Sequence, residues 1–593
     1  KKPKRNFAAV AELRGTTFVS RFVDDFDRNS ITGAVDVTGS LVGDTILGRI
    51  VGEISSREGF RDFAFSKSEF IMPSLTWNIG EHTALTAQYE YRHTREHFDQ
   101  FLVAPQVTVS GVTFFDPSQI ADITTTYQQP TDFRAETGSA VNLFLQHQFG
   151  ADWRANIGYR RVRYDSNQKE FSNTGYALVA GERRVLRRAR HLQTARQYDY
   201  VDANLSGNFD TFGVGHKLLV GLNFGKDLVN ENRLKFFNSS NRNATTGLCP
   251  VNGTCLDIGL YNPIYTTTPA FDSLGATNPQ LANQAILLTD RYVRQSNYGI
   301  YVSDLLTLTE WLKVSLGGRN FSETADVEAN RRLNSPRLKR TDKRSFLPSA
   351  GVLIQPSKKV TFYGSYAQSF VPNDPALQDF NGNLGVFTPI TGTQVEAGVK
   401  AENLLDNRLS FTAAVYRIDQ RGQVTTDACT FGTCATQIGR GRSDGFEIEG
   451  NLTPVDNWQV ILGYTHIKAF VLEARPGSEF QEGRQLPNVA KNAANMWTRY
   501  DFSNGIGIGL GVIYTGERTG VLPTTATDLS IIPLPAYTIV DAGLYYTGKG
   551  FSVNLKVGNI FDKRYIENTG ATARIQISPG APRYGTLTTR FTF

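Results

Sequence analysis

The last eleven residues, 583–593, read RYGTLTTRFTF and decide how the rest of the chain is interpreted. Counted back from the end, and apart from Thr589, one set of alternate positions is apolar or small: Phe593, Phe591, Leu587 and Gly585. The other set is Thr592, Arg590, Thr588, Thr586 and Tyr584. Because successive side chains of a β-strand point to opposite faces, this stretch predicts a closing strand with one apolar and one polar face.

The same alternation recurs almost from end to end. Clear period-2 segments begin at Leu85, Val141, Val201, Leu409, Phe446 and Phe551. The connections between segments alternate between short turns and long polar loops. Short turns are predicted near 77–82, 149–152, 210–215, 309–311, 355–358, 403–408, 454–458, 501–505 and 547–550, and long loops near 96–133, 167–196, 230–295, 326–343, 372–391, 422–440, 472–490, 516–535 and 566–582. These connections predict an all-β antiparallel barrel of about 22 strands.

The polar face of these strands separates a membrane barrel from a soluble β-protein. It is rich in Glu, Arg, Asn and Gln, which a packed soluble core would not tolerate but a water-filled lumen would. Four of the five tryptophans, Trp77, Trp153, Trp311 and Trp458, lie within a few residues of a predicted short turn, as an aromatic girdle at one membrane interface would require. The soluble alternative, a large propeller, would show a repeat of roughly 40–50 residues, and none is visible.

Composition excludes several function classes. The net charge of +6 is small and dispersed, which does not indicate nucleic-acid binding. Seven histidines form no metal-ligand spacing, and the sequence contains no P-loop or nucleophile elbow, so we expect no enzyme and no protein-bound cofactor. Four cysteines form two local pairs, Cys249 with Cys255 and Cys429 with Cys434. Both pairs fit small disulfide loops in an oxidising compartment, and the alternative is four unpaired loop thiols.

Seven segments resemble the TonB-dependent outer-membrane receptors, specifically the siderophore receptors among them. They are HKLLVGLNF at 216–224, YGIYVSDLLTLTEWLKVSLGGR at 298–319, the hairpin at 346–370, the stretch 393–400 followed by 411–416, GFEIEG at 445–450, VGNIFDKRY at 557–565 and PGAPR at 579–583. The first departs from the family pattern at Asn223, where Asp is usual. A closing strand that ends in Phe593 also resembles the signal by which bacterial outer-membrane barrels are recognised for assembly.

The resemblance implies the location, the partners and the domain organisation. A receptor of this family is a monomer of the bacterial outer membrane, with short turns facing the periplasm and long loops facing outside. It binds a ferric siderophore that carries the iron, and contacts the barrel-assembly machinery and lipopolysaccharide. Its lumen holds an N-terminal plug that TonB pulls. We expect residues 1–5 to be a remnant of the plug-to-barrel connection and residues 6–593 to form the barrel.

Without a plug, two functions stay open. The first is ligand-gated, TonB-coupled uptake of a ferric siderophore, with a hydroxamate favoured. The second is a passive outer-membrane pore. A third hypothesis is an adhesion or phage-docking barrel. The long loops permit it, but no feature of the sequence favours it specifically. Lumen-facing charges expected to set the ion preference of a pore are Glu90, Arg92, Glu447, Glu449, Lys556 and Arg590.

The candidate ligand-binding residues lie in predicted outer loops. Phe98 and Phe101 occupy the place where ferrichrome-type receptors carry aromatic contacts, and Phe171 and Tyr176 occupy a similar place in the next loop. Planar side chains suit a compact, partly apolar ferric hydroxamate. Two basic runs, around Arg183 and Arg187 and around Arg331 and Arg340, could attract an anionic siderophore. Ordinary loop packing for the aromatic residues, and lipopolysaccharide phosphates or a solvated face for the basic runs, are the alternatives.

Overall fold

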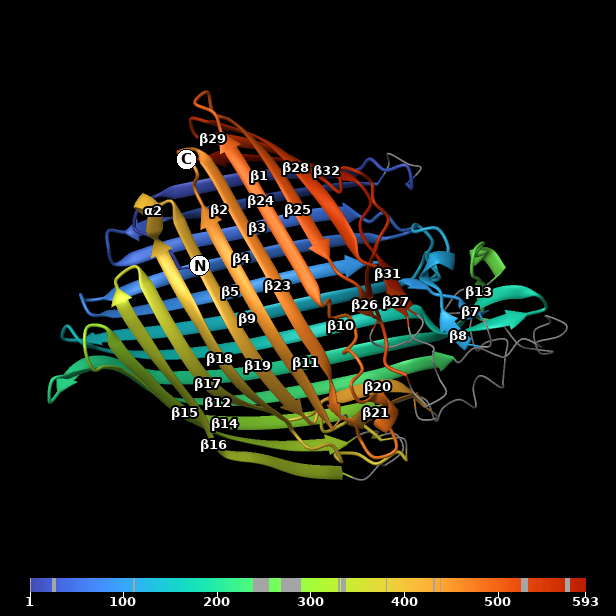
Figure 1. The fold of residues 1–593 in the computed structure, drawn as a ribbon, viewed down its shortest axis with the longest axis horizontal. Helices are drawn as coiled ribbons and strands as arrows, with labels where there is room; N and C mark the ends of the chain where they lie inside the picture. The colour runs from blue at the N-terminus through green and yellow to red at the C-terminus, as the bar shows by residue number, and fades with distance from the viewer. Residues whose placement is uncertain are drawn as a thin grey trace.

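The computed structural model describes residues 2–23, 28–109, 112–237, 255–267, 290–328, 331, 337–379, 381–429, 432–437, 439–523, 532–570 and 576–593. Its main sheet has 23 antiparallel strands, of which the two-residue β13 (Ile258–Gly259) only extends the outer end of β11, so 22 strands form the wall. The sheet closes because β1 pairs with β32, from Val10 opposite Thr592 to Phe18 opposite Tyr584. The predicted fold class is confirmed (Figure 1).

The wall strands follow one another in chain order. They are β1 (Ala8–Phe18), β2 (Asn29–Val42), β3 (Ile46–Glu58), β4 (Phe65–Ile79), β5 (Thr83–Glu96), β9 (Phe133–Phe149), β10 (Trp153–Val179), β11 (Glu182–Thr211), β12 (Val214–Phe237), β14 (Asp290–Thr307), β15 (Leu312–Glu328), β16 (Arg337–Ser357), β17 (Val360–Val371), β18 (Ile390–Asn403), β19 (Leu409–Arg421), β22 (Arg440–Leu452), β23 (Trp458–Glu473), β24 (Asn492–Asp501), β25 (Ile506–Thr515), β28 (Tyr537–Gly548), β29 (Phe551–Gly558) and β32 (Tyr584–Thr592).

The remaining elements belong to connections. The short helix α2 (Leu404–Asn407) lies in the turn between β18 and β19. The long connections contain β6 (Leu102–Val103), β7 (Gln106–Val109), β8 (Val112–Phe115), η1 (Pro117–Gln119), η2 (Tyr265–Thr267), β20 (Val424–Cys429), β21 (Gly432–Gln437), η6 (Glu479–Gln481), β26 (Arg518–Thr519), β27 (Pro533–Leu534), β30 (Ile566–Thr569) and β31 (Gln576–Pro579). Among the described residues, no helix is long and apolar enough to cross a membrane.

Short and long connections lie at opposite ends of the barrel (Figure 1). We call these the short-turn end and the loop end. The nine predicted short turns all join neighbouring strands, and a tenth, at residues 43–45 between β2 and β3, was missed by the sequence reading. Several of these turns contain a glycine with positive φ, such as Gly213 (φ 84°) and Gly550 (φ 79°), because a tight reversal needs a backbone conformation that other residues rarely adopt.

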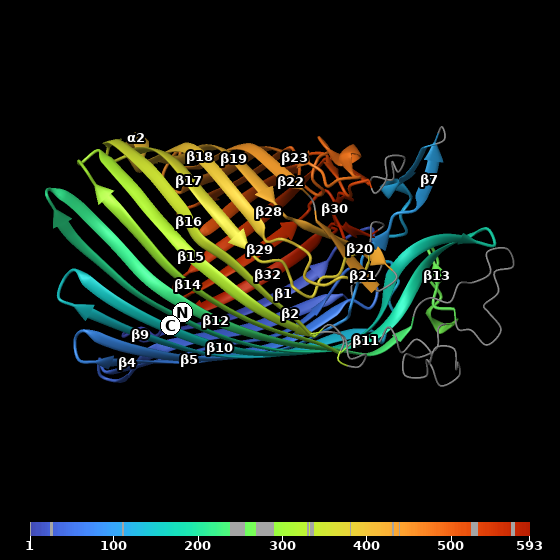
Figure 2. The ribbon, with the colours of Figure 1, turned by 90° about the horizontal axis from the view of Figure 1, so that it is seen from below.

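One predicted long loop is wrong. Residues 167–196 form the outer part of the β10–β11 hairpin, whose strands are 27 and 30 residues long and turn at Ala180 and Gly181. The two strands stay paired to the tip, where Val179 lies opposite Glu182. They continue beyond the neighbouring strands because charged side chains pair across them, as Glu170 does with Arg190. Figure 2 shows this hairpin extending past the rim toward β13.

The strand faces match the predicted alternation. Tyr89 on β5 and Leu587 on β32 are exposed on the outer, apolar face. Thr86 lies on the opposite face of β5 from Tyr89 and is almost fully buried. Trp77, Trp311 and Trp458 lie at the short-turn end with 46%, 52% and 40% of their surface exposed, and Trp153 begins β10 at the same end. A band of exposed apolar residues edged by tryptophan is what a lipid-facing wall requires.

The chain enters the wall from inside the barrel. The backbone N–H of Lys4 donates to the hydroxyl of Thr38 (2.8 Å), and the Arg49 guanidinium donates to the Lys2 carbonyl (3.1 Å). Thr38 and Arg49 are buried and face the lumen, opposite to the exposed Val37 and Ile50. The segment 2–5 therefore lies against the inner wall near the short-turn end, before β1 begins at Ala8.

Candidate functional site: a packed cap of loops

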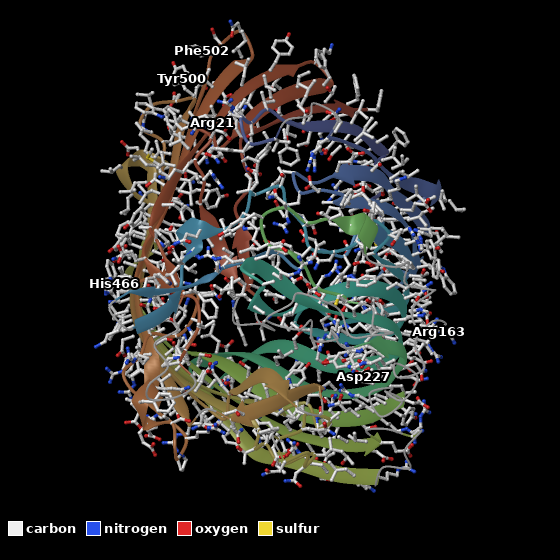
Figure 3. All side chains as sticks on the ribbon, turned by 90° about the vertical axis from the view of Figure 1, so that its right-hand side faces the viewer. Arg21, Arg163, Asp227, His466, Tyr500 and Phe502 are labelled. Atoms are coloured by element: carbon white, nitrogen blue, oxygen red, sulfur yellow. The ribbon has the colours of Figure 1, made fainter. Side chains whose placement is uncertain are left out.

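Loops from distant parts of the sequence share one hydrophobic core at the loop end. We call this assembly the cap and define it as residues 97–132, 171–190, 255–267, 518–534 and 566–579, where described. Its core contains the buried residues Leu102, Val103, Ala104, Phe115, Ala121, Tyr127, Val185, Ile258, Leu260, Val521, Ile532, Leu534 and Ile577. Seen from the loop end, these segments lie within the outline of the ring of strands (Figure 3). Burial of this core stabilises the closed arrangement of the loops.

A small sheet links the first part of the cap to the last. β6 pairs with β31, Ile577 opposite Leu102 and Gln576 opposite Val103, and β31 pairs with β30. The connection that precedes the closing strand β32 is thereby joined to the loop after β5. Leu102 and Ile577 are both fully buried at this junction. A backbone ladder between two buried strands gives the cap a defined geometry.

A buried arginine organises the middle of the cap. Arg187 is 0% exposed and donates to the Tyr127 carbonyl (2.7 Å) and to the Leu256 carbonyl, and its guanidinium lies 5.2 Å from the centre of the Phe171 ring. The Tyr127 hydroxyl donates to the Leu260 carbonyl (3.0 Å). One side chain thus satisfies carbonyls from two separate loops, which would otherwise be buried without partners.

Asp132 makes a second polar junction. Its carboxylate accepts the backbone N–H groups of Gln129 (3.0 Å) and Phe171 (2.8 Å). Burial raises the pKa of Asp132 to about 7, although the two N–H groups and the charge of Arg187 act in the opposite direction. A third junction joins Arg61, before β4, to Asp99, with Nη2 to Oδ1 at 3.0 Å.

The structure divides the candidate ligand residues into two groups. Phe171 and Arg187 have no exposed surface, so in this arrangement they hold the cap together and present nothing to a ligand. Phe98, Phe101 and Tyr176 are half-buried; Phe101 has a positive φ of 66°, and Tyr176 packs against the cap core. Arg183 is also half-buried and donates to Gln119 (3.1 Å) and to the Tyr261 hydroxyl (2.8 Å).

Acidic neighbours pair with part of each basic run. Arg184 pairs with Asp257 and Glu182, and Arg190 pairs with Glu170. In the second run Arg331 pairs with Asp290, Arg337 with Asp326 and Arg340 with Asp342, while Arg332 lies outside the described residues. Two runs that look like free positive surface in the sequence are therefore in part engaged in local ion pairs, and Arg183, Arg187 and Arg188 bind neutral groups of the protein.

The lumen wall below the cap carries a cluster of tyrosines and acids. The Tyr363 hydroxyl donates to Glu396 (2.6 Å) and the Tyr416 hydroxyl to Glu447 (2.9 Å), around a hollow of about 410 Å³ that Glu449 also lines. Elsewhere in the lumen Lys556 pairs with Asp541 at 2.9 Å. Glu447, Glu449 and Lys556 thus lie in the lumen as expected. The remaining predicted lumen residues, Glu90, Arg92 and Arg590, share the strand phase of Thr86 and Thr586, opposite to the exposed Tyr89 and Leu587.

The described residues contain no group of three or more His, Cys, Asp or Glu side chains placed to hold a metal ion. Cys255 is disulfide-bonded, and Cys249, its predicted partner, lies outside the described residues. Cys429 and Cys434 lie on the paired strands β20 and β21, and their side chains also fall outside what the structure describes. The two predicted pairings stay predictions.

Sequence reading missed the cap residues that matter most for its geometry. Arg61, Asp99, Tyr127 and Asp132 carry no local signal, because each is an ordinary polar residue in a loop. Leu102 and Ile577 are apolar, but nothing in the sequence indicates that they are partners. The only local sign in the sequence is that apolar and β-branched residues surround Leu102 and Ile577, which is compatible with two short strands.

Comparison with known proteins agrees with this architecture. The family model described as "TonB dependent receptor-like, beta-barrel" matches residues 74–560. The chain is 26% identical over 551 residues to the metal-pseudopaline receptor CntO of Pseudomonas aeruginosa, covering 90% of this chain and 69% of that protein. It is 27% identical over 559 residues to the ferrioxamine B receptor of Salmonella typhimurium, covering 91% and 70%.

The fold is also shared with a solved structure. The ferric-catecholate import receptor Fiu of Escherichia coli K12, in its closed form, superposes with a TM-score of 0.78 at 20% identity, covering 100% of this chain and 82% of that one. The relatives named here are receptors rather than enzymes. With a closed 22-strand wall and a family match over most of its length, the chain belongs to the TonB-dependent receptors and forms a β-barrel of the outer membrane.

Proposed function

We propose that this chain binds a ferric siderophore at its cap and takes it up across the outer membrane. The observation that carries the proposal is the cap itself: long loops from distant parts of a receptor-family barrel pack into one ordered structure at the loop end. A pore with no ligand to recognise would not need five loop segments with a common core. The iron would arrive inside the siderophore, so the protein needs no metal ligands of its own.

A hydroxamate siderophore is the favoured ligand. Phe98, Phe101 and Tyr176 are half-buried aromatic residues in or beside the cap, and Arg183 supplies a cation. Such a set suits a compact chelate with apolar and polar faces. Similarity to a ferrioxamine B receptor supports this class, whereas similarity to a metal-pseudopaline receptor makes a metal–pseudopaline complex the alternative ligand. Direct binding measurements distinguish the two ligands.

The direct test is equilibrium binding of ferrioxamine B, ferrichrome, a ferric catecholate and a metal–pseudopaline complex to the purified barrel, followed by intrinsic tryptophan fluorescence. We expect the two ferric hydroxamates to bind at least tenfold more tightly than the others. Phe101→Ala should weaken that binding, and Phe212→Ala, an exposed phenylalanine at the short-turn end, should not. Equal binding of all four complexes would contradict the hydroxamate assignment.

Energy coupling through TonB is the second part of the proposal and depends on a plug inside the lumen. Segment 2–5 lies against the inner wall, so sequence joined to its amino end would begin inside the barrel. We infer that a plug occupies this position, that residues 1–5 belong to its connection, and that residues 6–593 are the barrel. Uptake of radiolabelled ferric siderophore into cells with and without TonB tests this directly, and uptake that is independent of TonB would contradict it.

A passive pore is the alternative, favoured by the charged lumen wall around Glu396, Glu447 and Lys556. Single-channel conductance of the chain in a planar bilayer separates the two functions. A large, steady conductance supports the pore, and a closed barrel that binds ferric siderophore supports the receptor. As further partners we propose the barrel-assembly machinery and lipopolysaccharide, and we propose that the receptor is a monomer.

A further inference from the structure

Trp497, the fifth tryptophan, lies inside strand β24 and faces the lumen. It is paired with Gly511 of β25. Its neighbour Met496 is exposed on the outer face, and so are Ile508 and Leu510 of β25. Because successive residues of a strand point to opposite faces, Trp497 and the glycines of β25 point into the barrel. Strands β24, β25 and β28 lie side by side in the wall (Figure 1).

The lumen face of β25 has glycine at three successive positions, Gly507, Gly509 and Gly511. Aromatic rings of the two neighbouring strands lie over this stripe. A Cβ atom at Gly511 would meet the Trp497 ring, and one at Gly509 would lie 2.8 Å from Cζ2 of Trp497 and 3.1 Å from Cε2 of Tyr545. The Trp497 ring therefore lies along the wall over two glycines, meets Tyr545 above Gly509, and presents its other face to the lumen.

An arginine completes this surface. The Arg499 guanidinium lies 4.0 Å from the centre of the Tyr545 ring, and its Nη2 donates to Asp501 (2.7 Å). Arg499 follows Trp497 by two residues on the same face of β24, and Asp501 balances its charge. Ile461, the direct partner of Trp497 on β23, is also exposed. We call Trp497, Arg499 and Tyr545 the lumen platform.

The platform differs from the other aromatic parts of the lumen wall. Three further tyrosines lie over glycines of neighbouring strands, but each hydroxyl donates to a carboxylate: Tyr301 to Asp202, Tyr363 to Glu396 and Tyr416 to Glu447. In the platform the carboxylate of Asp501 is bound to an arginine instead. The platform therefore offers an indole face and a guanidinium plane without excess negative charge.

Strand β28 connects the platform to the cap. Tyr537 and Tyr545 lie on the same face of this strand, eight residues apart, which is about 27 Å along an antiparallel strand. The Tyr537 ring contacts the cap, because the Arg518 guanidinium lies 5.4 Å from its centre. A tyrosine–arginine stack thus occurs at the cap and again at the platform. A ligand that leaves the cap along the lumen face of β28 reaches the platform.

We propose that the lumen platform is a second binding site for the ferric siderophore, which the ligand occupies after it leaves the cap. This inference rests on the proposed function and adds where the ligand is held inside the barrel. A compact ferric hydroxamate has apolar and polar surfaces that suit an indole face beside a guanidinium plane. Rings that lie along a glycine wall do not project, so they suit a passing small ligand better than the interdigitated packing of a protein interface.

The test is equilibrium dialysis of iron-labelled ferrichrome against the purified barrel, because this chelate is uncharged and is not drawn to the glutamates of the lumen. The unaltered barrel should bind a tight equivalent at the cap and a weaker one at the platform. Trp497→Leu should weaken the second about tenfold and leave the first unchanged. Phe101→Ala should weaken only the first. Trp497→Phe, which keeps a ring over the glycines, should retain most of the binding at the platform.

Tyr301→Leu is the matched control. It uncovers Gly221 as Trp497→Leu uncovers Gly511, so it reports the effect of removing a ring from the lumen wall. It should change neither equivalent, and heat-modifiable migration on a gel should show that every variant is a folded barrel. A single equivalent that only Phe101→Ala weakens would overturn the platform and leave the cap site in place. Equal loss of the weaker equivalent in Trp497→Leu and Tyr301→Leu would also overturn it.

The two sites can fail separately. If the only equivalent bound is one that Trp497→Leu weakens and Phe101→Ala does not, the platform stands and the proposed binding at the cap is wrong. In cells, Trp497→Leu should lower the maximal rate of ferrichrome uptake and leave the half-saturating concentration, which the cap sets, unchanged. An unchanged maximal rate would overturn the platform as a step on the route through the barrel.

Discussion

The carboxylate of Asp132 accepts the backbone N–H of Phe171 at 2.8 Å and so joins the loop after β5 to the β10–β11 hairpin. The Phe171 ring lies against the buried guanidinium of Arg187, which in turn donates to the Tyr127 carbonyl. Phe171 and Arg187, which the sequence predicts as ligand contacts, thus connect to Asp132, which the sequence does not single out. The order of the cap depends on this group of three side chains.

Cap stability should fall as the pH rises through neutrality. Burial raises the pKa of Asp132 from its ordinary value of 3.8 to about 7, so the folded cap holds the proton more tightly than an open cap does. The contribution is fully present below pH 3.8 and is lost as the pH rises through about 7. Exchange of the Phe171 and Gln129 amides, corrected for the intrinsic rate, should therefore be faster at about pH 8 than at about pH 5.

Asp132→Asn provides the control for this titration. The amide carbonyl can still accept both N–H groups, but it has no charge to bury. The corrected exchange of the Phe171 amide should then be independent of pH over the same interval. The same pH dependence in this variant would assign the titration to another group.

Arg187→Met should open the cap while the barrel wall remains intact. The substitution leaves the Tyr127 and Leu256 carbonyls buried without their donor, at a cost of about 2–3 kcal/mol to the closed cap. Faster proteolysis within residues 97–132, with unchanged heat-modifiable migration of the barrel on a gel, is the expected result. Arg183→Met serves as the control because that side chain is half-exposed. Equal proteolysis of the two variants would contradict the role of Arg187.

A disulfide across β6 and β31 should lock the cap. Leu102 and Ile577 are direct antiparallel partners, whose Cα atoms lie about 4.5–5.5 Å apart in such ladders, within the range of a disulfide. Oxidised Leu102→Cys/Ile577→Cys should resist proteolysis in the cap and lose siderophore uptake, and a reductant should restore both properties. Uptake that persists in the oxidised form would show that the cap need not separate at β6 and β31.

Neutralising the lumen cluster tests the pore alternative. Glu396→Gln/Glu447→Gln removes two negative charges from the wall while the Tyr363 and Tyr416 hydroxyls keep acceptors. In a conducting barrel, the cation preference measured from the reversal potential in a salt gradient should fall, because wall charges set the local ion concentration. Glu81→Gln, in the exposed turn between β4 and β5 and away from this cluster, should leave it unchanged. Identical reversal potentials in all three proteins would exclude this cluster as the selectivity determinant.

The closing phenylalanine should matter for assembly more than for stability. Phe593 is 73% exposed, and its backbone N–H donates to the Ala9 carbonyl (2.9 Å), a bond that needs no particular side chain. Phe593→Ala should reduce the amount of folded barrel in the outer-membrane fraction but leave the melting temperature of the purified barrel nearly unchanged. Phe212→Ala, in the turn after β11, should affect neither quantity.

The wall of the barrel could be predicted because its information is local. Alternation at Leu85, Phe551 and the closing strand sets which face meets lipid, and the turn residues set where each strand ends. Where the local signal was ambiguous the prediction failed. The outer part of the β10–β11 hairpin reads as a loop because it is rich in charged and polar residues, and cross-strand ion pairs such as Glu170 with Arg190 are not visible in sequence.

The sequence by itself therefore determined a closed antiparallel barrel, its apolar and polar faces, its short-turn end and its family. Only the tertiary structure decided that Arg187 is buried, that Leu102 pairs with Ile577, and that loops from distant parts of the sequence share one core at the loop end. The physical reason is the separation along the sequence between the residues that determine each feature. Strand periodicity is fixed by neighbours two residues apart, whereas the cap and the pairing of β1 with β32 form from residues hundreds of positions apart, which the closure of the barrel brings together.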